Sequence, residues 1–179
     1  MNWNIDHKHS NIEFTARHMM FTKVRGRFEE FEGEINFDPS NPTNTTIDIE
    51  IDTDSIKTND KDRDNHLRSA DFLQVEEYPT IKFVSKRIEQ HDKNSGTLIG
   101  DLTIRDQTKE VSLDVEYYGL QTDPWGGTRA VFSGDTTINR KDWGLTWNVA
   151  LEAGGFLVSD KLDINIEIQL VQVTEPVPA

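Results

Sequence analysis

The chain has 179 residues and no cysteine, and its 32 acidic and 19 basic residues give a formal net charge of -13. The lack of cysteine excludes disulfides, thiolate metal sites and a cysteine nucleophile. The acidity argues against nucleic acid as a partner and against electrostatic docking on an anionic membrane, because both need clustered Lys and Arg.

The length fits a single domain, which we place at residues 1–173, followed by a flexible tail at residues 174–179. The first residues, MNWNIDHKHSNIEF, contain no basic region followed by an apolar run, so no signal peptide is visible. We therefore expect a cytoplasmic protein, with a trimmed exported form as the alternative. No apolar stretch approaches the length of a membrane span, which predicts no stable membrane insertion.

Along the chain the dominant hydrophobic period is two, which is typical of half-buried β-strands. It begins at residues 12–18, returns at 47–51, 98–104, 111–117 and 130–138, and is cleanest at 162–170, where Leu162, Ile164, Ile166, Ile168 and Leu170 alternate with polar residues. Turn sequences at 38–42, 93–96 and 122–127 separate these runs. The pattern predicts an all-β, antiparallel up-and-down barrel of about eight strands, with a two-sheet sandwich as the rival fold.

The stretch RDNHLRSADF, residues 63–72, interrupts the strands. It predicts one short helix from about Asn59 to Ser69, with Asn59 or Asp60 as N-cap. Since so short a helix is marginal alone, it must dock, and Leu67 and Phe72 are its sizeable apolar side chains. We expect it at the mouth of the barrel.

Histidines are the only candidates for metal or acid–base chemistry that stand out from the many carboxylates. His7 and His9 would share one face of a strand and make half a metal site, but no third ligand follows from spacing, so we predict no metal. His18 continues an inward face, where a satisfied core histidine is the plainer interpretation. No catalytic or cofactor motif is present, so we predict neither a catalytic residue nor a cofactor.

The inward faces combine bulky and small residues. Five of the nine Phe fall on them, interspersed with small or polar positions at Ala16, Gly33, Gly100, Ala130, Gly134 and Thr136. Such alternation leaves an apolar ligand cavity or fits the taper of a filled barrel, and the pattern alone does not choose between the two.

Several motifs together resemble the YceI-like family. They are Trp3-x-Ile5-Asp6-x-x-His9-Ser10-x-Ile12-x-Phe14, Val24-Arg25-Gly26-x-Phe28-x-x-Phe31-x-Gly33, the stretch RDNHLRSADF, Tyr78-Pro79-x-Ile81-x-Phe83, Gly100-x-Leu102-Thr103-Ile104 and Arg140-x-Asp142-Trp143-Gly144. The resemblance covers nearly the whole chain in order. It implies a lipocalin-like extended barrel that binds long amphiphilic lipids, polyisoprenoids in particular, lengthwise in an apolar pore, and a possible homodimer.

By this resemblance the ligand is a polyisoprenoid or an isoprenoid quinone, and the protein binds, stores or transports it without catalysis. The predicted pore residues are Phe14, His18, Phe28, Phe37, Ile49, Leu67, Phe72, Ile81, Phe83, Leu102, Ile104, Phe132, Trp143 and Ile164. His66 and Arg68 are the predicted contacts of the polar head group.

The sequence departs from the family pattern in lacking an export signal and in the segment Leu145–Ser159, which would form a mobile flap or a wide connection. Two other functions stay open: a filled-barrel interaction or stress protein, and an enzyme using His18 or His66 on a lipid-like substrate.

Overall fold

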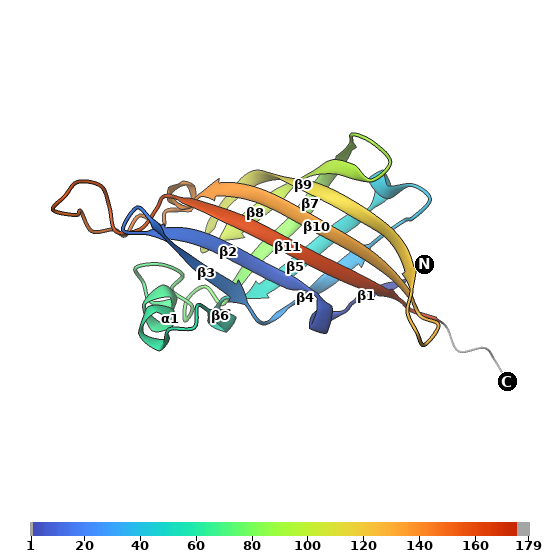
Figure 1. The fold of residues 1–179 in the computed structure, drawn as a ribbon, viewed down its shortest axis with the longest axis horizontal. Coiled ribbons are helices and arrows are strands. Elements are labelled where there is room, and N and C mark those ends of the chain that lie inside the picture. Colours follow the sequence, from blue (N-terminus) through green and yellow to red (C-terminus); the bar gives the residue numbers. More distant parts are fainter. Residues whose placement is uncertain (1, 175–179) are drawn as a thin grey trace.

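A computed structural model of the protein describes residues 2–174 and shows an elongated, curled antiparallel sheet with one α-helix (Figure 1). The strands are β1 (Trp3–Ile5), β2 (Asn11–His18), β3 (Thr22–Phe28), β4 (Phe31–Asn36), β5 (Thr46–Asp52), β6 (Ile56–Lys57), β7 (Thr80–Gln90), β8 (Ser95–Ile104), β9 (Gln107–Thr122), β10 (Thr128–Asn139) and β11 (Lys161–Gln172). The helix is α1 (Lys61–Arg68), and the 3-10 turns are η1 (His7–His9), η2 (Pro42–Asn44), η3 (Thr53–Ser55) and η4 (Arg140–Trp143).

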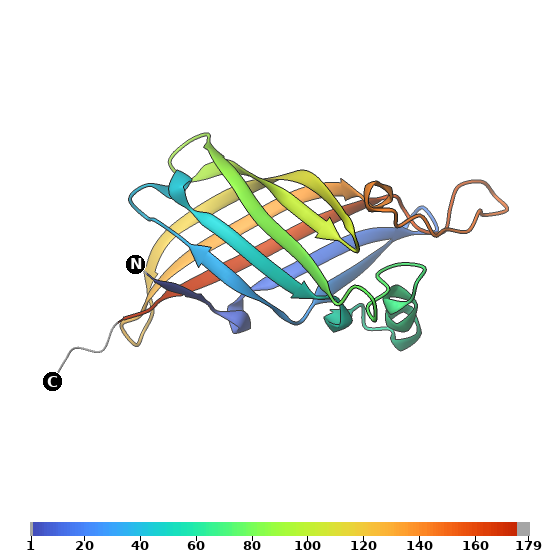
Figure 2. The same ribbon diagram turned by 180° about the vertical axis from the view of Figure 1, so that it is seen from behind.

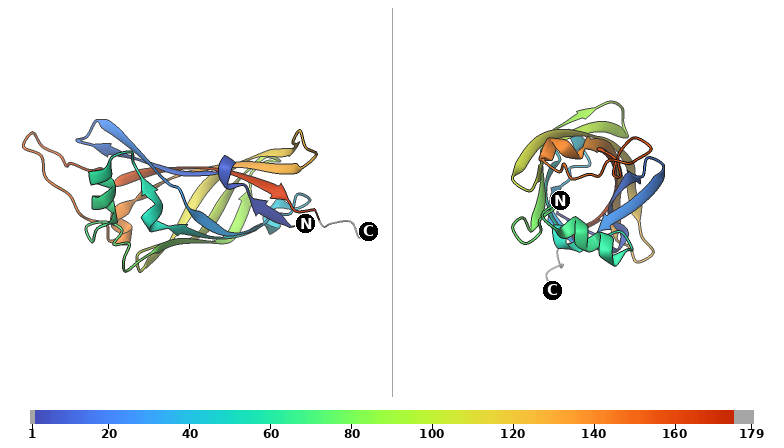
Figure 3. Two further views of the ribbon diagram at one scale, coloured as in Figure 1. Left: turned by 90° about the horizontal axis from the view of Figure 1, so that it is seen from below. Right: turned by 90° about the vertical axis from the view of Figure 1, so that its left-hand side faces the viewer.

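The strands follow the order β4-β5-β7-β8-β9-β10-β11-β2-β3-β6, with β1 paired to β11. Viewed along the long axis they form a ring (Figure 3, right), and β4, β5 and β7 make the wall seen from behind (Figure 2). The predicted all-β antiparallel barrel with one short helix is confirmed. The predicted number of about eight strands is too low, because short pieces such as β1 and β6 carry no readable alternation.

Backbone pairing alone does not close the ring. Among the described residues β3 and β4, although consecutive, are not paired with each other, so backbone pairing is interrupted between them. At one end β6 continues from β5 and pairs with β3. At the other end the Trp3 indole nitrogen donates to the Phe37 carbonyl, just beyond β4, at 3.0 Å. These two links hold the seam together where main-chain pairing is absent.

An ionic contact fixes the N-terminal segment to β10. Asp6 lies between Arg129, which donates to its carboxylate, and the ring of His9 at 2.8 Å. Burial alone would raise the pKa of Asp6, but its hydrogen bonds with Arg129, with His9 and with the backbone N–H of Lys8 lower it to about 2. The carboxylate therefore stays ionised and ties the start of the chain to β10.

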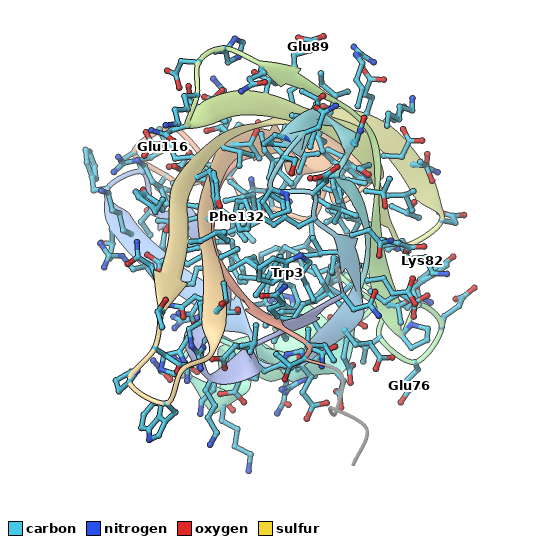
Figure 4. The ribbon with its side chains drawn as sticks, turned by 90° about the vertical axis from the view of Figure 1, so that its right-hand side faces the viewer. Trp3, Glu76, Lys82, Glu89, Glu116 and Phe132 are labelled. Atoms are coloured by element: carbon cyan, nitrogen blue, oxygen red, sulfur yellow. The ribbon has the colours of Figure 1, made fainter. Side chains whose placement is uncertain are left out.

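Alternation sets which side chains face inward. In Figure 4, Trp3 and Phe132 lie inside the ring, whereas Lys82, Glu89 and Glu116 project outward. The apolar members of β11 pair in register with inward residues of its neighbours: Ile164 with Phe14 and Thr136, Ile166 with Ile12 and Gly134. One inner face is thus continuous from strand to strand.

Of the two predicted N-caps of helix α1, Asp60 is the one observed, and its side chain accepts from the Arg63 N–H. Its buried Asp64 accepts from both the backbone N–H and the hydroxyl of Thr58, at 2.8 and 2.5 Å. These bonds dock the helix on the segment after β6, at one end of the barrel.

The segment Leu145–Ser159 is an irregular connection at the same end of the barrel as α1 (Figure 1). The buried Arg140 guanidinium donates to the carbonyls of Leu145 at 2.7 Å and Ser159 at 2.9 Å, so one side chain holds both ends of the segment. Of the predicted tail, residues 175–179 lie outside the described residues. None of the described helices has the length and apolarity that would let it cross a membrane.

Candidate functional site: an apolar cavity inside the barrel

The barrel encloses a cavity of about 330 Å³. Its walls are almost entirely hydrocarbon side chains from the inner faces of the strands, with Leu67, Phe72, Leu73 and Leu145 at the α1 end. Along β7 the lining runs from Ile81 to Gln90, which is roughly 30 Å of strand at the usual rise per residue. The space is therefore long and narrow, with the shape of an extended chain.

Glycines shape this cavity in two opposite ways. A Cβ at Gly100 would lie 2.5 Å from the tip of the Phe83 ring, so this glycine makes room for a wall aromatic. Gly26 does the same for Phe14. Gly134 differs, because a Cβ there would meet its nearest atom, a Leu113 methyl, only at 3.7 Å. At Gly134 the missing side chain leaves open space in the cavity rather than space for a neighbouring ring.

The α1 end of the cavity is closed by buried apolar side chains. Phe72, Leu73 and Leu145 are nearly inaccessible to solvent. Trp143 lies beside them and donates from its indole nitrogen to the Leu102 carbonyl at 2.9 Å. Helix α1 therefore lies at one end of the barrel, as predicted, but buried side chains close that end where a mouth was expected.

Polar lining concentrates at the opposite end, between η2 and the β7–β8 turn. It comes from Thr43, Thr45, Gln90, Asp92, Lys93, Asn94 and Ser95. The Tyr117 N–H donates to the Asn94 carbonyl at 2.7 Å, which places Tyr117 beside this turn. We call this group with Tyr117 the polar entrance.

Two hydroxyls of the polar entrance stand out. The buried Thr45 Oγ1 has no hydrogen-bond partner among the described residues, a rare state for a buried hydroxyl. Tyr117 lines the cavity within an aromatic cluster, its ring 5.2 Å from Phe37 and 5.0 Å from Phe132, and burial raises its pKa, so its hydroxyl remains neutral and able to donate. Both groups are suited to a polar atom of a ligand.

Charge at the polar entrance is mixed. Hydrogen bonds from the Asn94 N–H and Ser95 lower the pKa of Asp92, so this carboxylate is ionised at neutral pH. Lys93 is the one cationic residue in the lining. A strongly anionic head group would therefore meet one cation and one fixed anion here.

Twelve of the fourteen predicted pore residues line the cavity together. They are Phe14, Phe28, Phe37, Ile49, Leu67, Phe72, Ile81, Phe83, Leu102, Ile104, Phe132 and Ile164. The other two do not line it: His18 is exposed at the end of β2, and Trp143 is packed behind the wall. Ligand contact by the twelve stays a prediction.

The predicted head-group contacts, His66 and Arg68, also lie outside the cavity lining. His66 Nε2 is 2.9 Å from Asp71, and its ring packs at 4.5 Å against Trp147. Arg68 donates to the Ile56 carbonyl and borders a charged hollow of about 440 Å³ between α1 and β6, on the outside of the barrel. Arg68 thus ties α1 to the backbone of β6, and His66 is already paired with Asp71 just after the helix.

A histidine–carboxylate pair at His66 and Asp71 was not foreseen from the sequence. Such a pair is what an acid–base mechanism would need, but neither residue lines the cavity.

His7 and His9 do not form the strand predicted for them. They lie in η1, which the Asp6 side chain caps by accepting from the Lys8 N–H. His7 packs against Phe31, with ring centroids 5.1 Å apart. In the described part of the chain, no group of three or more His, Asp or Glu side chains is arranged to hold a metal ion.

The sequence did not predict the residues of the polar entrance, among them Tyr117, Thr45 and Asn94. Tyr117 could have been predicted as an inward residue, since it ends the alternation through Val111, Leu113 and Val115. Thr45 and Asn94 gave no such signal, because they lie in turns that only the closed barrel brings together.

Comparison with known proteins places this geometry in a family. Residues 3–170 match the YceI-like domain. A UPF0312 protein of Vibrio cholerae is 40% identical over 139 residues, covering 76% of this chain and 72% of that protein. One of Shewanella denitrificans is 37% identical over 161 residues, covering 89% and 81%.

Solved structures agree with the sequence matches. The Campylobacter jejuni YceI protein superposes with a TM-score of 0.75 at 29% identity, covering 88% of this chain and 90% of that one. A polyisoprenoid binding domain from Saccharophagus degradans shares the fold with a TM-score of 0.67 at 13% identity, covering 95% and 98%. From the match over residues 3–170 and these relatives, the chain belongs to the YceI-like family.

Proposed function

We propose that the protein binds one long-chain isoprenoid lipid lengthwise inside the barrel and carries or stores it without chemical change. The observation that carries this proposal is the long cavity whose walls are almost entirely hydrocarbon and whose polar lining is concentrated at one entrance. The Saccharophagus degradans domain, described as polyisoprenoid binding, supports the choice of lipid class.

Binding would rest on burial of the chain. Each CH₂ removed from water contributes about 0.8 kcal/mol, so one five-carbon isoprene unit adds up to about 4 kcal/mol before the cost of ordering the chain. A few hydrogen bonds at the head would set orientation more than affinity.

The polar end of the lipid would lie at the polar entrance. Thr45 and Tyr117 offer hydroxyls, and Asn94 offers an amide. Since Asp92 is ionised, an uncharged head such as an alcohol or a quinone carbonyl suits this end better than a diphosphate.

A chain-length series tests the proposal. Delipidated protein would be titrated with prenols of increasing length, and binding would be followed by calorimetry. We expect the affinity to rise with each isoprene unit until the cavity is filled and then to level off. Affinity that does not depend on chain length would refute lengthwise burial.

The preference for an uncharged head group is tested separately. A prenol and a prenyl diphosphate of equal chain length would be measured side by side, and the prenol should bind more tightly. Tighter binding of the diphosphate would overturn the assignment of an uncharged head, while leaving burial of the chain in place.

A further inference from the structure

The turn between β2 and β3 exposes three consecutive large apolar side chains. Met19, Met20 and Phe21 are 51%, 53% and 84% exposed. Met19 and Met20 have φ values of 51° and 71°, in the left-handed region that such residues rarely occupy. The fold therefore holds these side chains in water in a backbone conformation with an energetic cost, which is a common sign of a functional surface.

A second segment joins this turn. The Met19 N–H donates to the Leu157 carbonyl at 2.8 Å, and the sulfur of Met20 packs against Gly155. Val149 and Phe156 in the same segment are also exposed. Met19, Met20, Phe21, Val149 and Phe156 form what we call the apolar tip, which projects at one end of the long axis (Figure 1, left).

Basic residues run up to the apolar tip on the outer face of the β2–β3 hairpin. Register places Arg17 opposite Lys23, and Arg25 opposite Thr15, whereas Phe14 of the same strand faces the cavity. Arg17, Lys23 and Arg25 therefore share the outer face, and we call them the basic stripe. None of the three forms an ion pair within residues 2–174.

Several acidic groups lie near the stripe, and Asp160, which follows the Arg17-bonded Ser159, pairs with Lys141 at 3.3 Å. Glu13 lies opposite Arg27 further along the hairpin, and Asp163 of β11 lies opposite Thr15 and accepts from Thr137. Glu152 is exposed within the second segment. Although the net charge of the chain is -13, three cations without an ion pair among the described residues therefore lie beside the apolar tip at one end of the molecule.

We propose that this end of the barrel docks reversibly on a lipid bilayer that contains anionic lipids. The apolar tip would enter the boundary between head groups and acyl chains, and the basic stripe would meet lipid phosphates. Charge complementarity selects this partner, because an anionic bilayer offers both an apolar interior and a negative surface. Docking would place the closed α1 end of the cavity next to the membrane, with the polar entrance facing away from it.

Vesicle co-sedimentation tests the charge requirement. Delipidated protein would be mixed with vesicles of phosphatidylcholine alone, or of phosphatidylcholine with phosphatidylglycerol, neither containing isoprenoid. We expect binding only to the anionic vesicles, weakening as salt rises. Absence of binding, or equal binding to both vesicle types, would overturn the proposal.

A matched pair of triple variants separates local charge from net charge. Arg17→Gln, Lys23→Gln and Arg25→Gln together should weaken binding about a hundredfold, since each surface cation near such a membrane contributes about fivefold. The control variant, Lys82→Gln with Lys86→Gln and Arg87→Gln, removes the same charge from the exposed face of β7 and should weaken binding much less. Equal loss in both variants would contradict docking through the basic stripe.

Orientation is tested with a single polarity-sensitive fluorophore, because the chain has no cysteine to compete for labelling. A label on Phe21→Cys should shift to the blue with anionic vesicles, and a label on Trp125→Cys should not. Trp125 is a fair control since it is 87% exposed, in the β9–β10 turn at the other end of the barrel. A shift at Trp125 and none at Phe21 would overturn the proposed orientation.

The docking proposal can fail separately from the proposed function. The vesicles contain no isoprenoid, so a cavity that never binds such a lipid would leave their binding unchanged. Conversely, isoprenoid binding in solution would persist if the apolar tip never met a membrane.

Discussion

Replacing Gly134 by leucine should block the cavity without disturbing the barrel. Gly134 lines the cavity on β10, and a Cβ there would meet its nearest neighbours at 3.7 to 3.9 Å, which is ordinary van der Waals contact. The four carbons of the new side chain would therefore extend into the space that the lipid chain is proposed to fill.

The expected magnitude follows from the displaced hydrocarbon. If four ligand carbons lose their place, binding weakens by about 3 kcal/mol, which is roughly two-hundredfold in Kd. The unliganded protein should be at least as stable as the wild type, because the leucine is buried and glycine is unfavourable inside a strand by about 0.5–1 kcal/mol.

Calorimetric titration with a long prenol and thermal unfolding of the unliganded protein measure both effects. Asp135→Leu adds an apolar side chain to the same strand at an exposed position and should leave Kd within about twofold. A Gly134→Leu protein that melts normally and binds prenol as tightly as the wild type would refute binding inside the cavity.

Three further predictions concern the entrance, the N-terminal anchor and the long connection. Thr45→Val and Tyr117→Phe should each weaken binding of a prenol about fivefold, from one lost hydrogen bond, while leaving a hydrocarbon of similar length unaffected in the same titration. Because the pKa of Asp6 is lowered to about 2, its ion pair stabilises the fold above pH 4 and that stability is lost as the pH falls from 4 toward 2. Asp6→Asn should therefore cost about 2 kcal/mol in urea unfolding at pH 7 and almost nothing at pH 2, and an equal cost at both pH values would contradict this account. Arg140→Leu should speed amide hydrogen exchange across residues 145–159 while the strands stay protected, and unchanged exchange there would show that this side chain does not hold the segment.

The walls of the cavity could be predicted from the sequence because a strand's inward face is encoded locally, by a period of two. The alternation through Ile164, Ile166 and Ile168 needed no knowledge of the partner strands. Nine of the twelve predicted residues that line the cavity lie on strands, and the other three are Phe37, Leu67 and Phe72. The prediction that His18 lines the pore was wrong for the same local reason. The alternation continues into this last residue of β2, where the barrel no longer encloses the side chain.

The two ends of the barrel could not be predicted in this way, because loops that are distant in sequence build them. Thr45 and Asn94 meet at the polar entrance only after closure. The position of α1 suggested a head-group role for His66 and Arg68. In the structure His66 is paired with Asp71 and Arg68 donates to the Ile56 carbonyl, so both side chains stabilise the closed end of the barrel. The homodimer and the cytoplasmic location stay predictions.

Native mass spectrometry of protein purified without detergent shows whether the barrel carries an isoprenoid lipid. We expect a mass above that of the bare chain, with one long-chain isoprenoid or quinone released by organic extraction and identified. A bare-chain mass that does not shift when prenols are added would refute the proposed function.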